Sequence, residues 1–335
     1  DLSTDLKYLG SLDYIKVILL GFVITVLNNL FMSVLQSLGD SSTPFWALLV
    51  SSVTNIGLDC VFVLTLKWGV QGAAAATVLS QVFSFAICAA GLKRLKFVSI
   101  LDGSKSKNAR LTVRMLKTGL PVGIMSMVTA VGGMILQFFV NDLGASAVAA
   151  YAASTKIRSV IGEFSNALGM TFMTFVGQNY GAQKYDRIKA GVRMGVLLSI
   201  LIHIPLSAVE IFGGKRIASL MVTDPPVLEL CRQYLLIVGI FVFFLGFLMV
   251  FRNCIQGMGN TWIPMLSGGL EVFSRLIFGY WLGRHSFMGI AAAEASAWIS
   301  VSIMLGSSFF ILFRKVLRTQ TPENTTDTKN IRTDS

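Results

Sequence analysis

Two nine-residue segments of this chain share one pattern at a spacing of 220 residues. The pattern QxxG[DN][ST]xxP occurs at 36–44 (QSLGDSSTP) and at 256–264 (QGMGNTWIP), each after an apolar run of helix length. Further along, 69–81 (GVQGAAAATVLSQ) resembles 286–298 (SFMGIAAAEASAW) at a spacing of 217 residues. Solenoid repeats have periods of about 20–50 residues, so this longer period indicates a duplicated, domain-sized unit.

The composition places the duplicated unit in a membrane. The chain is 54% hydrophobic and 13% charged, with a mean hydropathy of +0.69, whereas soluble domains are roughly 25% charged. A spanning helix needs about 17–25 mostly apolar residues, and we expect nine spans, of which the fifth is long and begins near Ser146. Charge-free windows lie at 17–35, 69–92, 118–141, 164–183, 194–209, 233–251 and 295–313, and two more windows, 44–66 and 262–283, contain only Asp59 and the pair Glu271 and Arg275.

The net charge of +11 follows the predicted topology. If the loops are assigned alternately to the two sides, 17 of the 28 Lys and Arg residues lie on one side and six on the other. Cytoplasmic loops carry the excess of cations, so we predict a multi-pass protein of the cell membrane with a cytoplasmic C-terminus. This distribution excludes a nucleic-acid partner as the explanation of the basic charge.

The repeat predicts the domain organisation. Three expected spans precede the motif helix in the second copy and two follow it, whereas the first copy begins with that helix. We therefore expect an all-α membrane bundle of twelve helices with parallel six-helix repeats, nine of them here, and about 100 upstream residues. The predicted parts are 1–92 (second half of the first lobe), 93–117 (a basic cytoplasmic linker), 118–315 (the complete second lobe) and 316–335 (a disordered cytoplasmic tail).

Several segments resemble the multidrug and toxic compound extrusion (MATE) family of transporters, in family order along the chain. They include LQSLGDSSTPFW (35–46), TGLPVGI (118–124), FVGQNYGAQKYDRIKAGV (175–192), IQGMGNTWIP (255–264) and GLEVFSR (269–275). The resemblance implies two six-helix lobes around a central cavity. It also implies export of an organic cation or drug in exchange for inward H⁺ or Na⁺.

Ionisable residues inside spans are costly and usually face the interior, which makes them candidates for function. Glu271 and Arg275 are one helical turn apart and form either a structural ion pair or a gating and coupling pair. Asn55 and Asp59 have the same spacing in the matching helix of the first copy, with Asn55 at the position of Arg275. Asp59 either lines the cavity or lies at the interface near Lys67.

Other polar residues have more local interpretations. Gln137 and Asn141 lie one turn apart near the outer end of their span, and Gln137 is a candidate for lining the cavity. For Glu163, a pair with Arg158 or Lys156 is favoured over a role in transport. The repeated motifs predict tight cytoplasmic turns, with glycine ending one helix and proline restarting the next. Their marker residues are Gln36, Gly39, Pro44, Gln256, Gly259 and Pro264.

The leading functional hypothesis is a cation-coupled antiporter that exports drugs or organic cations, and a lipid-linked glycan flippase of the same superfamily is the alternative. A membrane enzyme or receptor is less favoured, because we find no His, Cys, Asp or Glu constellation in or beside a span. The single cysteines and the two histidines suggest no metal site or cofactor. We expect a monomer in the lipid bilayer, with H⁺ favoured over Na⁺ and an essential carboxylate in the first upstream helix.

Overall fold

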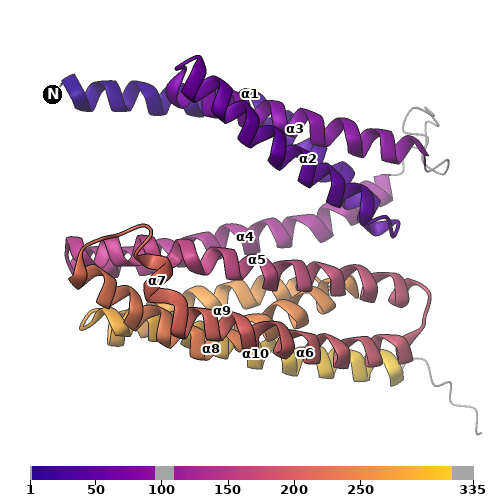
Figure 1. Cartoon of the computed structure of the whole chain (residues 1–335). Coiled ribbons are helices and arrows are strands. Elements are labelled where there is room, and N and C mark those ends of the chain that lie inside the picture. The colour runs from indigo at the N-terminus through magenta and orange to yellow at the C-terminus, as the bar shows by residue number, and fades with distance from the viewer. Residues whose placement is uncertain (1, 95–108, 319–335) are drawn as a thin grey trace, which may run out of the picture. The chain divides into compact units, whose positions relative to one another are not determined.

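The computed structural model describes residues 2–94 and 109–318, with side chains from residue 16 onward. The chain forms two compact units, which we call the first and second bundles, and the described residues contain no strand. The first bundle contains α1 (Leu2–Ser37), α2 (Ser42–Asp59), the π-helical turn η1 (Cys60–Thr65) and α3 (Gly69–Arg94) (Figure 1). The second bundle contains α4 (Ala109–Asp142), α5 (Ala145–Gly181), α6 (Tyr185–Ala208), η2 (Val209–Gly213), α7 (Gly214–Ala218), α8 (Pro225–Gly257), α9 (Trp262–Phe278), η3 (Gly279–Gly283) and α10 (Phe287–Arg318).

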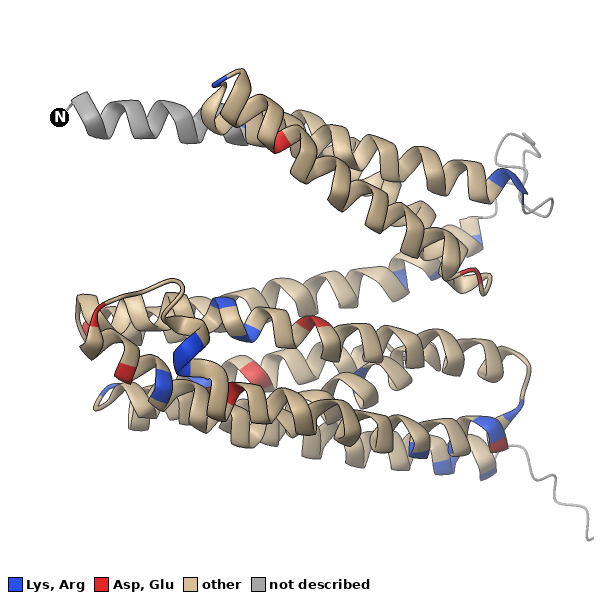
Figure 2. Ribbon diagram, in the orientation of Figure 1, with Lys and Arg blue, Asp and Glu red and all other residues tan. Residues whose placement is uncertain are grey.

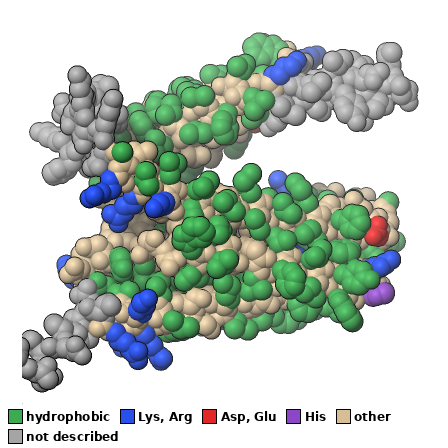
Figure 3. Space-filling model, turned by 180° about the vertical axis from the view of Figure 1, so that it is seen from behind, with side chains coloured by type: hydrophobic (Ala, Val, Ile, Leu, Met, Phe, Trp, Pro, Cys, Tyr) green, Lys and Arg blue, Asp and Glu red, His purple; other side chains and the backbone are tan. Residues whose placement is uncertain are grey.

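Helical membrane architecture is confirmed. In the described residues, seven stretches are long and apolar enough to cross a membrane. The two other predicted spans are α5 and α9 with η3, which are helical but carry charged residues that lower their hydropathy. Figure 3 shows hydrophobic side chains spread along the sides of both bundles, as expected of surfaces that contact lipid. The count of twelve helices for the whole protein stays a prediction.

The two copies of the motif form the same turn. Gly39 and Gly259 adopt φ of 91° and 82°, a left-handed conformation that glycine adopts without strain. The amides after them bond back five residues, Asp40 to the Leu35 carbonyl at 3.0 Å and Asn260 to the Ile255 carbonyl at 3.3 Å. This bonding pattern is a Schellman turn, which satisfies carbonyls left free at the end of a helix.

The polar residue of each motif also caps the next helix. The Asp40 carboxylate accepts bonds from the Thr43 amide at 3.0 Å and the Thr43 hydroxyl at 2.6 Å. These bonds hold the pKa of Asp40 below its usual value. In the second copy, the Asn260 side chain accepts the Ile263 amide at 3.2 Å. The duplicated sequence thus produces a duplicated helix–turn–helix.

Helix α8 is the central element of the second bundle, since it packs against α5, α6 and α10. It is apolar around its circumference, which suits a helix surrounded by protein. Half of its most apolar window is buried, compared with 22% for α4. Its buried side chains include Tyr234, Leu235 and Leu248, and Trp298 of α10 is the largest fully buried residue. This central position makes polar groups on α8 costly unless they are paired.

Helix occupies both ends of the predicted linker 93–117, because α3 continues to Arg94 and α4 begins at Ala109. The part of the linker between these helices lies outside the described residues. The same holds for the predicted tail after Arg318.

Candidate functional site

Glu271 is held between two arginines inside the second bundle. Helix α9 places Glu271 and Arg275 one turn apart on the same face, with Arg275 Nη2 2.9 Å from Glu271 Oε1. Arg252 of α8 approaches the other carboxylate oxygen, with Nη2 3.0 Å from Oε2. Because the three side chains are at most 7% exposed, each buried charge depends on its partner for stabilisation.

Glu294 of α10 continues this chain of charges. Its Oε1 lies 3.8 Å from Arg275 Nη2 and 3.3 Å from Arg158 Nη2 of α5. The Tyr234 hydroxyl of α8 donates a hydrogen bond to Oε2. The Arg158 guanidinium also lies over the Trp298 ring, 5.9 Å from its centroid. Glu294 therefore joins helices that are distant in the sequence.

We call Arg158, Arg252, Glu271, Arg275 and Glu294 the charge network. It ties α5, α8, α9 and α10 together, and Arg275 Nη1 also donates to the Thr129 carbonyl of α4 at 3.4 Å. Figure 2 shows acidic and basic residues between the ends of the second bundle, on helices otherwise without charge. The Nε atom of each of the three arginines is buried without a described hydrogen-bond partner. The network is thus only partly satisfied by protein groups and has a formal charge of +1.

Glu210 is a sixth buried charge beside this network. It lies in η2 and is 1% exposed, and neither carboxylate oxygen has a hydrogen-bond partner among the described residues. Its Cβ packs so closely on Gly239 of α8 that a Cβ at Gly239 would lie only 3.0 Å away. Arg158 and Glu294 are the charged groups that interact with it. With Glu210 ionised, three arginines face three carboxylates and the charges balance.

The arrangement predicts unequal effects of substitutions on the two sides of the α9 pair. Glu271→Ala leaves Arg252 and Arg275 without their shared carboxylate, a loss that costs about 3–5 kcal/mol for buried pairs. Arg275→Ala leaves Glu271 still bonded to Arg252, so we expect a smaller loss. Melting temperatures of the two purified variants in detergent measure the difference. A larger fall for Arg275→Ala would contradict the bridging role of Glu271.

The structure brings only Glu271 and Arg275 of the predicted candidates into the network. Gln137 and Asn141 bond to each other at 2.8 Å on α4. The predicted pairing of Glu163 with Arg158 or Lys156 is wrong for Arg158, which instead bonds to Glu294. Glu163 is exposed on α5 and has no ion pair with another described residue. The α5 backbone directs Arg158 into the bundle and Glu163 away from it.

Asn55 and Asp59 belong to the first bundle and are half-buried. The Asn55 amide nitrogen and one Asp59 carboxylate oxygen are buried without a hydrogen-bond partner in the described part of the chain. No ion pair between Asp59 and Lys67 occurs there. Their roles in transport stay predictions.

Sequence reasoning missed three of the charged residues. The charge-free windows end at 209 and 251 and begin at 295, so Glu210, Arg252 and Glu294 were each treated as the border of a window. The expectation that no acidic constellation lies in the spans was therefore wrong. Single charges with apolar residues on both sides were the signal that could have found them. Among the described residues, no group of three or more His, Cys, Asp and Glu side chains could hold a metal ion.

The duplication places uncharged residues at the corresponding positions of the first copy. At the spacing of 220 residues, Glu271 and Arg275 match Ser51 and Asn55, and Arg252 matches Met32. At the spacing of 217, Glu294 matches Thr77. The charge network is thus a specialisation of the second copy, which the fold itself does not require.

Known proteins of similar sequence and fold share this architecture. The MatE family model matches residues 121–281. The probable multidrug resistance protein YoeA of Bacillus subtilis is 27% identical over 303 residues, covering 84% of this chain and 65% of that protein. The probable multidrug resistance protein NorM of Thermotoga maritima is 24% identical over 310 residues, covering 90% and 66%.

A crystal structure of a mutant of the Vibrio cholerae MATE transporter VcmN shares the fold. Its TM-score is 0.76 at 22% identity, over 88% of this chain and 66% of that one. The chain spans about two thirds of the length of the curated relatives it matches. Together these comparisons confirm the resemblance and identify the chain as a sequence of the MATE family of membrane transporters.

Proposed function

We propose that this chain acts as a cation-coupled antiporter that exports drugs or organic cations from the cell by alternating access. The sequence relatives named as multidrug resistance proteins support the substrate class. The observation that carries the coupling is the buried charge network with the unpartnered Glu210 beside it. Arginine does not lose its proton in proteins, so the carboxylates are the groups of this site that exchange a cation.

Glu210 is the proposed exchange point within the second bundle. A buried carboxylate without a hydrogen-bond donor is unfavourable, and a bound proton or a monovalent cation would remove that cost. When the site opens to the other side of the membrane, water solvates the carboxylate and the cation leaves. The predicted carboxylate in an upstream helix is compatible with this second site, and we favour H⁺ as the coupling ion.

The test is transport of a fluorescent lipophilic cation, ethidium, in vesicles that carry the complete protein. We expect an imposed pH gradient to drive ethidium transport and a Na⁺ gradient of equal size to have little effect. Nigericin, which dissipates the pH gradient, should stop it. Transport driven by Na⁺ alone would reverse the choice of ion. Transport that responds to neither gradient would contradict the antiporter.

The predicted orientation has its own test. In a background with exposed Cys60 replaced by serine, a cysteine at Ser41 should react only with reagents that enter the cytoplasm, and one at Ser286 should react from outside. Both serines are exposed at turns assigned to opposite sides by the distribution of Lys and Arg. Labelling of both positions by an impermeant reagent added outside would refute the orientation.

A further inference from the structure

A basic groove lies at the end of the second bundle where α4 and α9 begin. It has a volume of about 400 Å³ and lies between the first turns of α4 and the turn that joins α8 to α9. Arg110, Arg114 and Lys117 line it, spaced so that they share one face of α4. Thr261 and Trp262 line the opposite wall. We call this feature the basic groove.

The groove concentrates positive charge without a counter-ion. No acidic residue lines it, and no ion pair joins its three cations to another described residue. The start of α9, a helix of 17 residues, forms part of the wall, and the start of a helix carries partial positive charge. Cations held close together repel one another unless an anion lies between them, so the groove is complementary to a phosphate-sized anion.

Apolar surface adjoins this charge. Val113 lines the groove and is 48% exposed, and the Trp262 indole is 62% exposed. Further along the same two helices, Leu120 and Leu266 are 65% and 59% exposed. Tryptophan is enriched where membrane and water meet. A ligand with a phosphate in the groove therefore has an apolar surface beside it for hydrocarbon chains.

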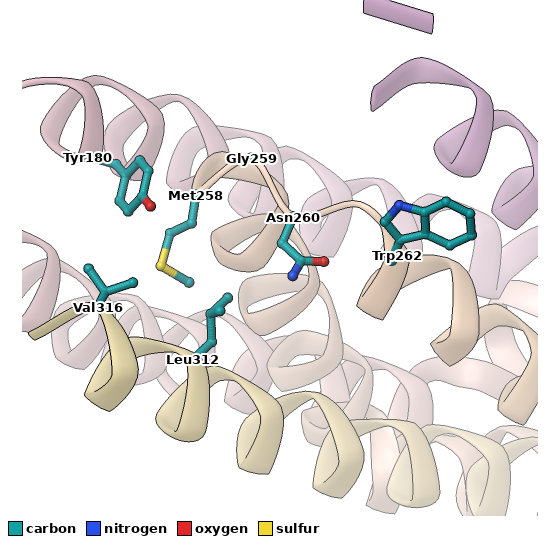
Figure 4. Close-up of a pocket in the computed structure, with 7 residues that line it drawn as sticks. All are labelled: Tyr180, Met258, Gly259, Asn260, Trp262, Leu312 and Val316. Atoms are coloured by element: carbon teal, nitrogen blue, oxygen red, sulfur yellow. The ribbon is translucent and has the colours of Figure 1, made fainter. Parts of the chain in front are cut away.

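The neighbouring pocket on the other side of the same turn has a different character. It has a volume of about 280 Å³ and is lined by uncharged residues that include Tyr180, Met258 and Leu312. Figure 4 shows these three side chains gathered together, with the Trp262 indole apart from them. The comparison shows that positive charge at this end is concentrated on the α4 side of the turn.

We propose that the basic groove binds the headgroup of an anionic phospholipid, such as phosphatidylglycerol, with its acyl chains along α4 and α9. The groove lies at the end of the bundle that the distribution of Lys and Arg assigns to the cytoplasm, where anionic lipids attract basic segments at the membrane surface. The bound lipid fixes α4 relative to the α8–α9 turn. This inference is independent of the exported substrate.

Native mass spectrometry of the delipidated protein in detergent tests the proposal by titration with phosphatidylglycerol or phosphatidylcholine. We expect one phosphatidylglycerol to bind preferentially. The triple variant Arg110→Gln, Arg114→Gln, Lys117→Gln should weaken its binding by about tenfold or more, since each cation near an anionic surface contributes on the order of 1 kcal/mol. Melting temperature without lipid should stay unchanged, because all three side chains are exposed.

The matched control removes the same charge from α6. Arg187→Gln, Lys189→Gln and Arg193→Gln again replace two arginines and one lysine, and these side chains are also exposed. We expect phosphatidylglycerol binding of this control to stay within about twofold of the unmodified protein, because these cations lie outside the groove.

Equal weakening in both triple variants, no weakening in either, or equal binding of phosphatidylcholine would overturn the proposal. Inorganic phosphate separates the two sources of a phosphate group. Millimolar phosphate should not displace the lipid, and displacement would assign the groove to a free anion instead.

Discussion

Glu294→Ala is expected to destabilise the second bundle more than any other single substitution in the charge network. Glu294 is 1% exposed and accepts contacts from Arg158, Arg275 and Tyr234. Truncation leaves two buried cations short of a counter-charge and a phenol without its acceptor. Breaking a buried pair costs about 3–5 kcal/mol. We expect most of the expressed protein to be lost from the monodisperse peak in size-exclusion chromatography, and the remainder to melt at a lower temperature.

Glu163→Ala is the matched control for this prediction. It removes a glutamate from a helix of the same bundle, but from an exposed position without an ion pair among the described residues. Its yield and melting temperature should equal those of the unmodified protein. Glu294→Gln, which retains an acceptor for Tyr234, should fall between the two. Equal behaviour of Glu294→Ala and Glu163→Ala would mean that the network contributes little to folding.

The duplicated turns were predictable because their determinants are local. Glycine at positive φ, an Asp or Asn cap and a proline in the next helix act within nine residues, so the pattern alone predicts the turn. The pair of Glu271 and Arg275 was predictable for the same reason, since four residues form one helical turn. The spans followed from composition, because few other structures accommodate such apolar stretches.

The remainder of the network depends on packing between helices, which spacing along the chain does not reveal. Arg252 meets Glu271 across 19 residues and Tyr234 meets Glu294 across 60. The orientation of α5 likewise decided that Arg158 bonds to Glu294. Local spacing favoured Glu163 instead, because the nearest opposite charge in sequence is the natural partner when helix orientation is unknown.

Glu210→Gln is expected to abolish transport driven by a pH gradient while leaving the protein folded. Glutamine matches the shape of a protonated glutamate, so it should fit beside Gly239 without the cost of an unpartnered buried charge. It cannot release a proton, however, so the site would stay in one charge state throughout the cycle. In vesicles that carry the complete protein, we expect the initial rate of ethidium transport driven by a pH gradient to fall by about tenfold or more, as for loss of a positioned proton-transfer group.

Two measurements separate coupling from a structural role of Glu210. Exchange of internal for external ethidium at equal pH needs no net proton movement, so Glu210→Gln should retain it. Glu163→Gln, the same chemical change at the exposed position on α5, should retain both exchange and transport driven by the pH gradient. If Glu210 only fills space beside α8, glutamine serves equally well and transport driven by the pH gradient persists. That result would remove Glu210 from the coupling mechanism, and the predicted carboxylate in an upstream helix would then have to exchange the proton without it.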